Sequence, residues 1–523
     1  MRLGVDVGGT NTDAVLMEGR TVVAEFKTPT TPDVTTGIVK AIEGVRSARA
    51  FEASEIDAVM IGTTHFTNAV VEARRLLPTA AIRLGLPATA ALPPMVDWPE
   101  RLREALGGHV FLCHGGHEFD GRQISPLDPD ELRRAAEEIG RRGISTVAIS
   151  SVFSPVNQEM EEEAARVVRE ELPGVAVSLS HEIGRIGLLE RENATILNAC
   201  LRQLADQIPD ALEEAVKSAG IQAPLFISQN DGTLMSVDYC RQYPVATFAS
   251  GPTNSMRGAA FLSGEGDCIV VDVGGTTTDV GALQHGFPRE ASVEVEVGGV
   301  RTNFRMPDVL SVGLGGGSLV KADGDQVEVG PQSVGYEITE KALVFGGDTL
   351  TATDLAVAAG LYELGDVSRA RGIERRVVEA GVRRIFERAA EVVDRVKTSA
   401  EPLPVVVVGG GSILLPDEME GASKVVKPEH FAVANAIGAA IAQVGGEVDR
   451  VFSLESVGRE QAIGQARQEA EEKAVTAGAD PSTVQVVDVE EVPLAYLPSN
   501  AVRIRVKAVG DLRLGDGRGP AGH

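Results

Sequence analysis

A nine-residue segment occurs twice in the chain, and this duplication limits the possible folds more than any other feature. Residues 5–13 read VDVGGTNTD and residues 271–279 read VDVGGTTTD, so eight of nine positions match. Valine and threonine favour strands, whereas Gly-Gly permits a tight turn. Each copy therefore predicts a strand–turn–strand hairpin. Two copies 266 residues apart indicate two similarly built halves and not a short tandem repeat.

The hairpins have the composition of a phosphate site. Glycines let backbone N–H groups approach an anion closely, and threonine hydroxyls add donors. Asp6 and Asp272 end the first strands, where a carboxylate can hold Mg²⁺ directly or through water. Two ordinary glycine turns are the alternative, but two matched copies with two carboxylates each disfavour it. The expected nucleotide contacts are Gly8, Gly9, Thr10, Asn11, Thr12, Asp13, Gly274, Gly275, Thr276 and Thr277.

Beyond the first hairpin, predicted strands alternate with predicted helices. Asp128-Pro129 is a helix-start signal for a polar helix that runs to residue 142. An apolar strand at 146–152 and a charged helix at 158–171 follow. This alternation predicts an α/β fold. The acidic run at 159–163 is interpreted as a solvated helix face.

The later part of the chain continues the alternation and suggests boundaries. Its predicted elements are a long helix at 190–208, a buried strand at 405–408, a small-residue helix at 428–443, a helix at 457–477, and strands at 484–489 and 501–508. The expected units are half-domain I at 1–200, half-domain II at 201–430, a connecting helix at 431–445 and a small C-terminal α/β unit at 446–523.

Composition excludes several classes of partner. The chain has 49 basic and 75 acidic residues, a net charge of −26. Such a surface repels nucleic acid and anionic membranes, so neither is expected as a partner. The four cysteines form no C-x-x-C pair. Without a signal-peptide pattern or a long apolar run, the chain is expected to be cytoplasmic.

The order of hairpin, long helix, second hairpin, glycine loop and small-residue helix resembles the actin-like ATPases, which include sugar kinases and 70-kDa heat-shock chaperones. No G-x-x-x-x-G-K-[ST] motif is present, which disfavours a P-loop enzyme. The resemblance implies two duplicated RNase H-like half-domains around one ATP, with 190–208 and 428–443 as connecting helices. It implies Mg²⁺ at Asp6 and Asp272, catalytic roles for these two and Asp279, and an adenosine loop at Gly409, Gly410 and Gly411.

Further motifs resemble the hydantoinase A and 5-oxoprolinase family. They lie at 62–69, 116–122, 191–199, 230–235, 250–252 and 312–318. The family opens cyclic amides such as hydantoins and 5-oxoproline with ATP, and relatives carboxylate ketones. The resemblance implies a cyclic-amide substrate near Thr63, Thr64, His65, Asn68, Gly315, Gly316 and Ser318. His65-Phe66 replaces the smaller residues expected there, which indicates a different specificity if this loop meets the substrate.

Alternatives remain open at several points. A small-molecule kinase and a nucleotide-switched regulatory module would share the fold. The chain is shorter than the usual A subunit and lacks the hydrolytic half of full-length oxoprolinases, so a second hydrolase subunit and an oligomer are expected. The glycines at 315–317 could form an anion site or a tight strand connection. His109, Cys113, His114 and His117 lack a standard zinc spacing and are interpreted as a loop lining the cleft, and Asn435 as a partner for a backbone group.

Overall fold

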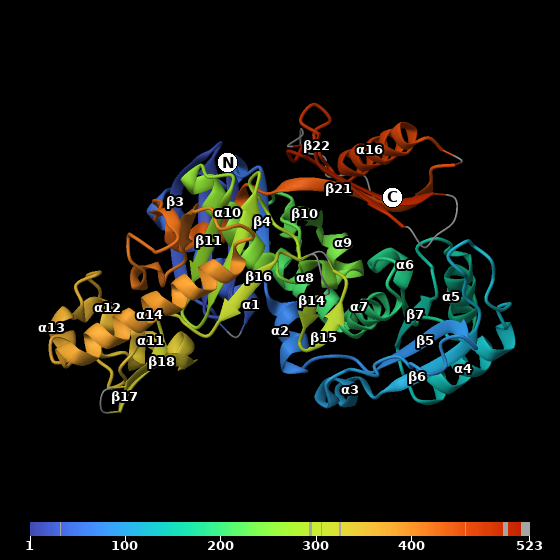
Figure 1. The fold of residues 1–523 in the computed structure, drawn as a ribbon, viewed down its shortest axis with the longest axis horizontal. Helices are drawn as coiled ribbons and strands as arrows, with labels where there is room; N and C mark the ends of the chain where they lie inside the picture. Colours follow the sequence, from blue (N-terminus) through green and yellow to red (C-terminus); the bar gives the residue numbers. More distant parts are fainter. Residues whose placement is uncertain are drawn as a thin grey trace.

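The computed structural model describes residues 1–31, 33–291, 295–304, 306–323, 326–455, 457–494 and 500–513. It has a mixed α/β architecture with parallel pairings in three sheets (Figure 1). The largest sheet has nine strands. In spatial order they are β22 (Gln485–Pro493), β23 (Ala501–Gly510), β21 (Gln443–Ser453), β10 (Thr233–Ser236), β9 (Leu225–Ser228), β4 (Ala58–Thr63), β1 (Arg2–Val7), β2 (Asn11–Glu18) and β3 (Thr21–Pro29).

A second sheet of six strands carries the second hairpin. Its strands are β13 (Phe287–Pro288), β12 (Thr278–Gln284), β11 (Cys268–Val273), β19 (Leu403–Val408) and β20 (Ala422–Val426), with β16 (Val309–Val312) also paired to β12. The long helix α14 (Arg375–Val396) packs on this sheet, and α12 (Ala352–Ala358) packs on α14. Aliphatic residues from these strands and helices form one core, to which β19 contributes Val405 and Val407.

The two hairpins occupy equivalent places in these sheets. β1 is antiparallel to β2 and parallel to β4, just as β11 is antiparallel to β12 and parallel to β19. The turns also match, since Gly8 N–H donates to Asn11 O (3.0 Å) and Gly274 N–H to Thr277 O (2.8 Å). Both predicted hairpins are confirmed.

Two helices cross between the large sheets. α10 (Ser250–Ser263) precedes β11, and α15 (Ala434–Ala440) packs on β1 and β4. They approach so closely that a Cβ added to Gly258 would lie 2.0 Å from Ala434 O, and one added to Gly438 would lie 1.8 Å from Asn254 O. Segment 190–208 was expected to be the first connecting helix, but α10 is the helix that packs on α15. Glycines on both helices, Gly258 in α10 and Gly438 in α15, permit this contact.

The helices expected at 190–208 and 428–443 are both shorter in the structure. Segment 190–208 is divided between α7 (Leu188–Cys200) and α8 (Arg202–Ser218), because Cys200 O accepts a hydrogen bond from Leu77 N (2.9 Å) and the helical ladder is interrupted. Segment 428–443 contains only a short 3₁₀ turn, Phe431–Val433, and α15, because His430 has a left-handed φ of 62° and β21 begins at Gln443.

A third sheet of four parallel strands forms a separate layer with its own apolar core. Its strands are β6 (His109–His114), β5 (Thr79–Leu86), β7 (Thr146–Ser151) and β8 (Ala176–Leu179). The helices α4 (Pro129–Arg141) and α5 (Glu159–Glu171) pack on it, and α3 (Glu100–Leu106) precedes β6. The predicted elements at 128–142, 146–152 and 158–171 are confirmed. Asp128 caps α4 by accepting from Asp130 N (2.9 Å).

The acidic run in α5 is only partly a solvated face. Glu159 and Glu162 are exposed, but Glu161 is fully buried. Its carboxylate accepts hydrogen bonds from Ser151 N (2.7 Å) and His181 Nδ1 (2.7 Å). Burial alone would raise the pKa of Glu161, but the hydrogen bonds from His181 and Ser180 outweigh it and lower that pKa. The sequence interpretation was therefore wrong for this residue.

The C-terminal strands extend the nine-stranded sheet. β21 pairs with β10 at one edge and with β23 at the other, and α16 (Arg459–Thr476) packs on β21 and β23. The predicted helix at 457–477 and both predicted strands are present. β9 and β10 belong to this sheet although the expected boundary placed them in half-domain II. Residues 514–523 of the expected C-terminal unit lie outside the described residues.

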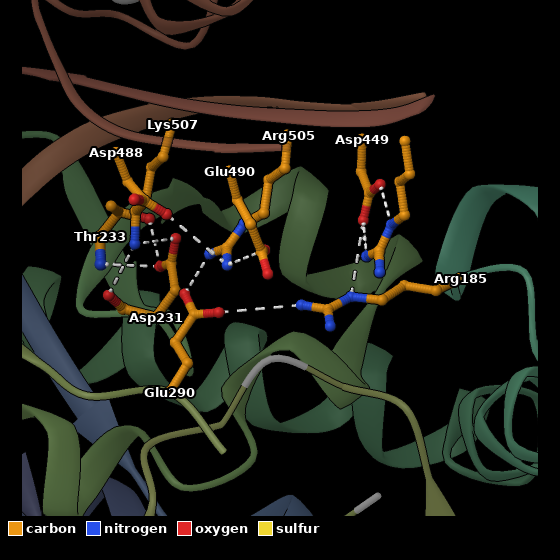
Figure 2. Close-up of polar contacts among 10 residues, drawn as sticks. Arg185, Asp231, Thr233, Glu290, Asp449, Asp488, Glu490, Arg505 and Lys507 are labelled. Carbon is orange, nitrogen blue, oxygen red and sulfur yellow. Dashed lines mark hydrogen bonds and ion pairs between the residues drawn. The ribbon is translucent and has the colours of Figure 1, made fainter. Parts of the chain in front are cut away.

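Charged side chains join the C-terminal strands to the rest of the molecule (Figure 2). Lys507 on β23 pairs with Asp231 in the β9–β10 turn (2.9 Å). Arg505 contacts Glu290, which follows β13. Arg185 lies near both Glu290 (3.8 Å) and Asp449 of β21 (3.6 Å). The C-terminal strands are thus held by ion pairs as well as by the sheet.

The remaining α-helices and strands lie in the described residues. They are α1 (Val34–Ala48), α2 (His65–Glu72), α6 (Ser180–Ile183), α9 (Val237–Gln242), β14 (Val295–Val297), β15 (Val300–Thr302), β17 (Ser318–Asp323), β18 (Gln326–Ser333), α11 (Ile338–Lys341) and α13 (Val367–Ala370). Among the described residues, no helix combines the length and apolar character needed to span a membrane.

Candidate functional site

The turns of the two hairpins meet. A Cβ added to Gly275 would lie 3.6 Å from Thr10 Cγ2, so the second turn contacts the first. Gly9, Thr276 and Thr277 are exposed at this place. The duplicated segments, far apart in sequence, therefore form one site.

Each hairpin places two aspartates opposite one another. The strand registers pair Asp6 with Asp13 and Asp272 with Asp279. Asp6 is 3% exposed, and burial, reinforced by the charge of Asp13, raises its pKa to about 7. Burial, reinforced by Asp279, likewise raises the pKa of Asp272 to about 6. Burial disfavours the ionised form of these carboxylates, and a cation beside them would stabilise it.

A lysine neutralises one of these aspartates. Lys27 lies opposite Asp13 in the β2–β3 register, and its Nζ contacts both carboxylate oxygens at 2.6 and 2.7 Å. Asp279 instead accepts a hydrogen bond from Ser311 Oγ, and burial raises the pKa of Asp279. The two hairpins thus match in backbone but differ in charge. Lys27 was missed in the sequence because its position depends on the strand register.

The run 315–318 packs beneath the second hairpin. Gly316 N–H donates to Gly274 O (3.0 Å) and Gly317 N–H to Gly275 O (2.7 Å). Gly315 N–H donates to Ser318 Oγ (2.9 Å), and Ser318 is fully buried. Because protein acceptors take these three N–H groups, the geometry favours a tight strand connection over an anion site.

The glycine loop at residues 409–411 lies against Asp272. Gly411 N–H donates to Val273 O (2.7 Å). Gly409 has a φ of +86°, and a Cβ there would lie 2.2 Å from Asp272 Oδ1, so glycine is required by both conformation and space. Gly410 is exposed and has open space where a Cβ would be. The predicted adenosine loop therefore borders the hairpin site.

The predicted substrate segment lies beside the first hairpin. The parallel β1–β4 register places Gly62 next to Asp6 and Thr63 next to Val7. Thr63 Oγ1 and His65 Nδ1 are 2.7 Å apart, and Asn68 Nδ2 donates to Thr64 Oγ1 (3.4 Å). Burial, assisted by the charge of Arg75, lowers the pKa of His65 to about 4. His65 is therefore a neutral imidazole at neutral pH.

Two asparagines that the sequence did not identify as site residues flank Asp6. Asn435 Nδ2 donates to Asp6 Oδ2 (3.4 Å), so the interpretation of Asn435 as a partner for a backbone group was wrong. Asn254 of α10 is fully buried beside Asp6. Both positions depend on the crossing of α10 and α15, for which the local sequence carries no signal.

The histidines and cysteine at 109–117 do not converge. His114 Nδ1 contacts Glu131 Oε1 (2.8 Å), and His109 Nδ1 contacts Arg142 Nη1 (2.9 Å). Burial raises the pKa of the Cys113 thiol to about 12, which disfavours the thiolate that a metal would bind. Within the described ranges, no group of three or more His, Cys, Asp or Glu side chains is placed to hold a metal.

Comparison with known proteins identifies relatives across the chain. A family model described as the hydantoinase/oxoprolinase N-terminal region matches residues 2–172, and one described as hydantoinase/oxoprolinase matches residues 191–392. Caprolactamase subunit alpha of Pseudomonas jessenii is 30% identical over 416 residues, covering 75% of this chain and 58% of the relative. Acetophenone carboxylase gamma subunit of Aromatoleum aromaticum is 28% identical over 396 residues, covering 68% and 53%. The chain thus spans little more than half the length of these two relatives.

Solved structures share the fold. ATP-dependent caprolactamase from Pseudomonas jessenii superposes with a TM-score of 0.77 at 21% identity, covering 98% of this chain and 88% of that one. A nucleotide-free acetone carboxylase gives a TM-score of 0.67 at 18% identity, with the same coverages. The two family models match the hairpin of residues 5–13, its repeat at 271–279 and most of the chain between them. The chain therefore belongs to the hydantoinase/oxoprolinase family.

Proposed function

We propose that this chain is the nucleotide-binding subunit of an ATP-dependent enzyme that opens a cyclic amide. Hydantoin, 5-oxoproline and related lactams are the substrate class. The observation that carries the proposal is the meeting of two matched glycine hairpins around two carboxylates, the buried Asp6 and the partly buried Asp272. The relationship to a caprolactamase subunit supports an amide as the substrate.

The matched hairpins also support a duplicated architecture. The same antiparallel and parallel pairings recur in the two large sheets, and α10 and α15 cross between them. We propose that the sheets are the cores of two RNase H-like half-domains of the actin-like type, with ATP held between them. On this proposal the four-stranded sheet at 79–179 is an insertion into the first half-domain.

The residues at the hairpins fit Mg²⁺ and ATP. Asp6 Oδ1 is buried without a hydrogen-bond partner, which suits a group that contacts a ligand. Mg²⁺ is commonly held by one or two carboxylates together with substrate phosphates, so Asp6 and Asp272 would suffice. The exposed glycines and threonines of the two turns and Gly410 are available to the nucleotide. When bound, Mg²⁺ would neutralise charge on the phosphates.

The chemistry explains why ATP is needed. An amide carbon is a poor electrophile because the nitrogen donates electron density to the carbonyl. In the proposed first step, the amide oxygen attacks the terminal phosphorus of ATP, and the bond to ADP breaks. Water then adds to the activated carbon, the C–N bond breaks, the nitrogen takes a proton and phosphate leaves. The sum is lactam, ATP and water giving amino acid, ADP and phosphate.

The chain's own residues would position the reactants. The segment with Thr63, Thr64, His65 and Asn68 lies against the first hairpin and is proposed to contact the amide. The neutral His65 imidazole can donate or accept a hydrogen bond without adding charge. With a cation bound, Asp6 and Asp272 would be ionised and held in fixed positions, which lowers reorganisation during phosphoryl transfer.

A second polypeptide is part of the proposal. Several relatives carry names of subunits: caprolactamase subunit alpha, acetophenone carboxylase gamma subunit and acetone carboxylase beta subunit. A phosphorylated amide released into water would hydrolyse outside the enzyme, so a partner that covers the site would retain it. The carboxylase names also support a second candidate, in which the activated substrate is a ketone that is then carboxylated.

ATPase stimulation distinguishes these functions. The chain, alone and with the protein that co-purifies from its native cell, is assayed with hydantoin, 5-oxoproline, caprolactam, a ketone with bicarbonate, and a polyol. Stimulation with ring opening by a cyclic amide supports the proposal. Stimulation by a ketone supports a carboxylase, accumulation of a phosphorylated polyol a kinase, and stimulation by protein alone a regulatory module. An isolated chain that opens a lactam at an ordinary rate, about 1–10³ per second, contradicts the need for a partner.

A further inference from the structure

Beside Asp6 lies a second polar group without a partner. Neither Nδ2 nor Oδ1 of Asn254 makes a hydrogen bond, and Asp6 Oδ1 makes none either. All three atoms are buried. Buried polar atoms in proteins are nearly always hydrogen-bonded, so three orphaned atoms from two neighbouring residues point to a ligand contact.

The two residues converge on one place. A Cβ added to Gly62 would lie 2.5 Å from Asp6 Oδ1 and 2.6 Å from Asn254 Nδ2. The glycine at position 62 therefore leaves room that both side chains border. On the other side of the carboxylate, Asn435 Nδ2 donates to Asp6 Oδ2 at 3.4 Å. One carboxylate oxygen is satisfied by the protein and the other faces Asn254.

The backbone holds Asn254 firmly in this position. Asn254 O lies against Gly438 of α15, where a Cβ would approach it to 1.8 Å. The neighbouring Thr253 is anchored by hydrogen bonds from its hydroxyl to Asn230 O and Ala249 O, both at 2.9 Å. Because the helix cannot shift easily, the empty hydrogen-bonding capacity of Asn254 is built into the fold.

We propose that Asn254 is a binding residue for the magnesium–nucleotide complex, and that its amide and Asp6 Oδ1 share a water molecule bound to that complex. The carboxylate oxygen accepts a hydrogen bond from the water, and the amide donates to the water or to a phosphate oxygen. The inference rests on the proposed function, because it requires that Mg-ATP bind between the hairpins. α10 leads into β11, which carries Asp272, so Asn254 would link the second hairpin's segment to Asp6.

The test compares Asn254→Leu with the wild type in two measurements. Leucine has the same branching and the same number of side-chain heavy atoms as asparagine, and it carries no polar atoms. Without nucleotide, the melting temperature should be unchanged or higher, because orphaned polar atoms are removed. By calorimetry, the affinity for Mg-ATP should fall at least about tenfold, as expected for a lost contact to a charged ligand. ATP binding in EDTA should change less than Mg-ATP binding.

Asn198→Leu is the matched control. Asn198 is also buried, but its Nδ2 donates to Ser178 Oγ (3.1 Å) and Gln242 O (3.0 Å), so the same substitution should lower the melting temperature and leave Mg-ATP affinity unchanged. If Asn254→Leu lowers the melting temperature and leaves the affinity at the wild-type value, Asn254 is structural and the inference is overturned. If the wild type itself binds no Mg-ATP, the proposed function fails, which is a different result.

A second variant covers the case in which leucine is not tolerated. Asn254→Asp keeps the shape of the side chain and adds a charge beside Asp6. It should weaken ATP binding in EDTA and increase the ratio of the affinities measured with and without Mg²⁺ by at least about threefold. A folded Asn254→Asp variant with the wild-type ratio overturns the inference.

Discussion

The largely buried ion pair between Asp231 and Lys507 anchors β23, the last strand in the sequence, and neutralising Asp231 should be costly. Figure 2 shows the two side chains in contact. Asp231 Oδ2 lies 2.9 Å from Lys507 Nζ, and their side chains are 15% and 7% exposed. Thr233 also donates to Asp231 Oδ1 from its backbone N (3.0 Å) and its hydroxyl (2.6 Å). Burial alone would raise the pKa of Asp231, but Lys507 and Thr233 outweigh it and lower that pKa to about 2.

The lowered pKa of Asp231 sets both the size and the pH dependence of its contribution to stability. A fall in pKa from 3.8 to about 2 corresponds to roughly 2 kcal/mol of stability from the ionised Asp231. Asp231→Asn also leaves Lys507 buried without its counter-ion, and such losses cost about 3–5 kcal/mol. Because the pKa is lower in the folded state, the contribution is present above about pH 4 and is lost as the pH falls from 4 towards 2.

The assay is hydrogen exchange of the β23 amides together with urea unfolding. We expect Asp231→Asn to lower the unfolding free energy of this region by about 3–5 kcal/mol at pH 7. Adding Lys507→Met should recover part of the loss, because no buried charge is then unpaired. Glu491→Gln is the control in the same unit. Its partner Arg459 is 62% exposed, and such surface pairs contribute about 0–1 kcal/mol. If Asp231→Asn costs no more than Glu491→Gln, the pair does not anchor β23.

Three further predictions concern the site and its support. Asp272→Asn should reduce ATP turnover at least about a hundredfold. The variant should melt no lower than the wild type, because burial disfavours the ionised carboxylate. Wild-type turnover in Asp272→Asn, measured beside the exposed control Glu391→Gln, would contradict a catalytic role for Asp272. Calorimetry with Mg-ATP should give one site per chain that EDTA weakens strongly, whereas metal-independent binding would argue against Mg²⁺ at the aspartates. Arg83→Met should destabilise the protein by about 3–5 kcal/mol, because it leaves the buried Glu192 without its counter-ion. Denaturation of this variant and of the double variant Arg83→Met, Glu192→Gln measures the effect, and equal losses of stability in both would refute the explanation.

Local patterns were sufficient for much of the fold. The hairpins at 5–13 and 271–279, the helix capped by Asp128 and the strand at 405–408 all occur as expected. These elements depend on residues close in sequence, such as a glycine pair, a cap or a valine run. Helix lengths were less predictable. The expected helix at 190–208 is interrupted after Cys200, because the N–H of a distant residue, Leu77, donates a hydrogen bond to the Cys200 carbonyl.

The candidate site was predicted in its backbone but not in its electrostatics. The repeat identified Asp6, Asp272 and their glycines, because a duplicated motif is visible without a structure. Lys27 lies in the site because the β2–β3 register pairs it with Asp13, and that register is not visible in the sequence. The interpretation of 315–318 was decided by contacts with the second hairpin, which occupy the glycine N–H groups.

Local patterns are enough to identify two matched hairpins, the two aspartates that each presents beside glycines, and the resemblance to ATP-dependent amide-opening proteins. The folded chain adds three contacts that no local pattern carries: the hairpins meet, α10 and not the 190–208 segment packs on α15, and Asn254 and Asn435 border Asp6. The difference lies in the range of the interactions. Turns, caps and strands follow from interactions between near neighbours, whereas the helix crossing depends on Gly258 and Gly438 fitting against backbones far away in the sequence.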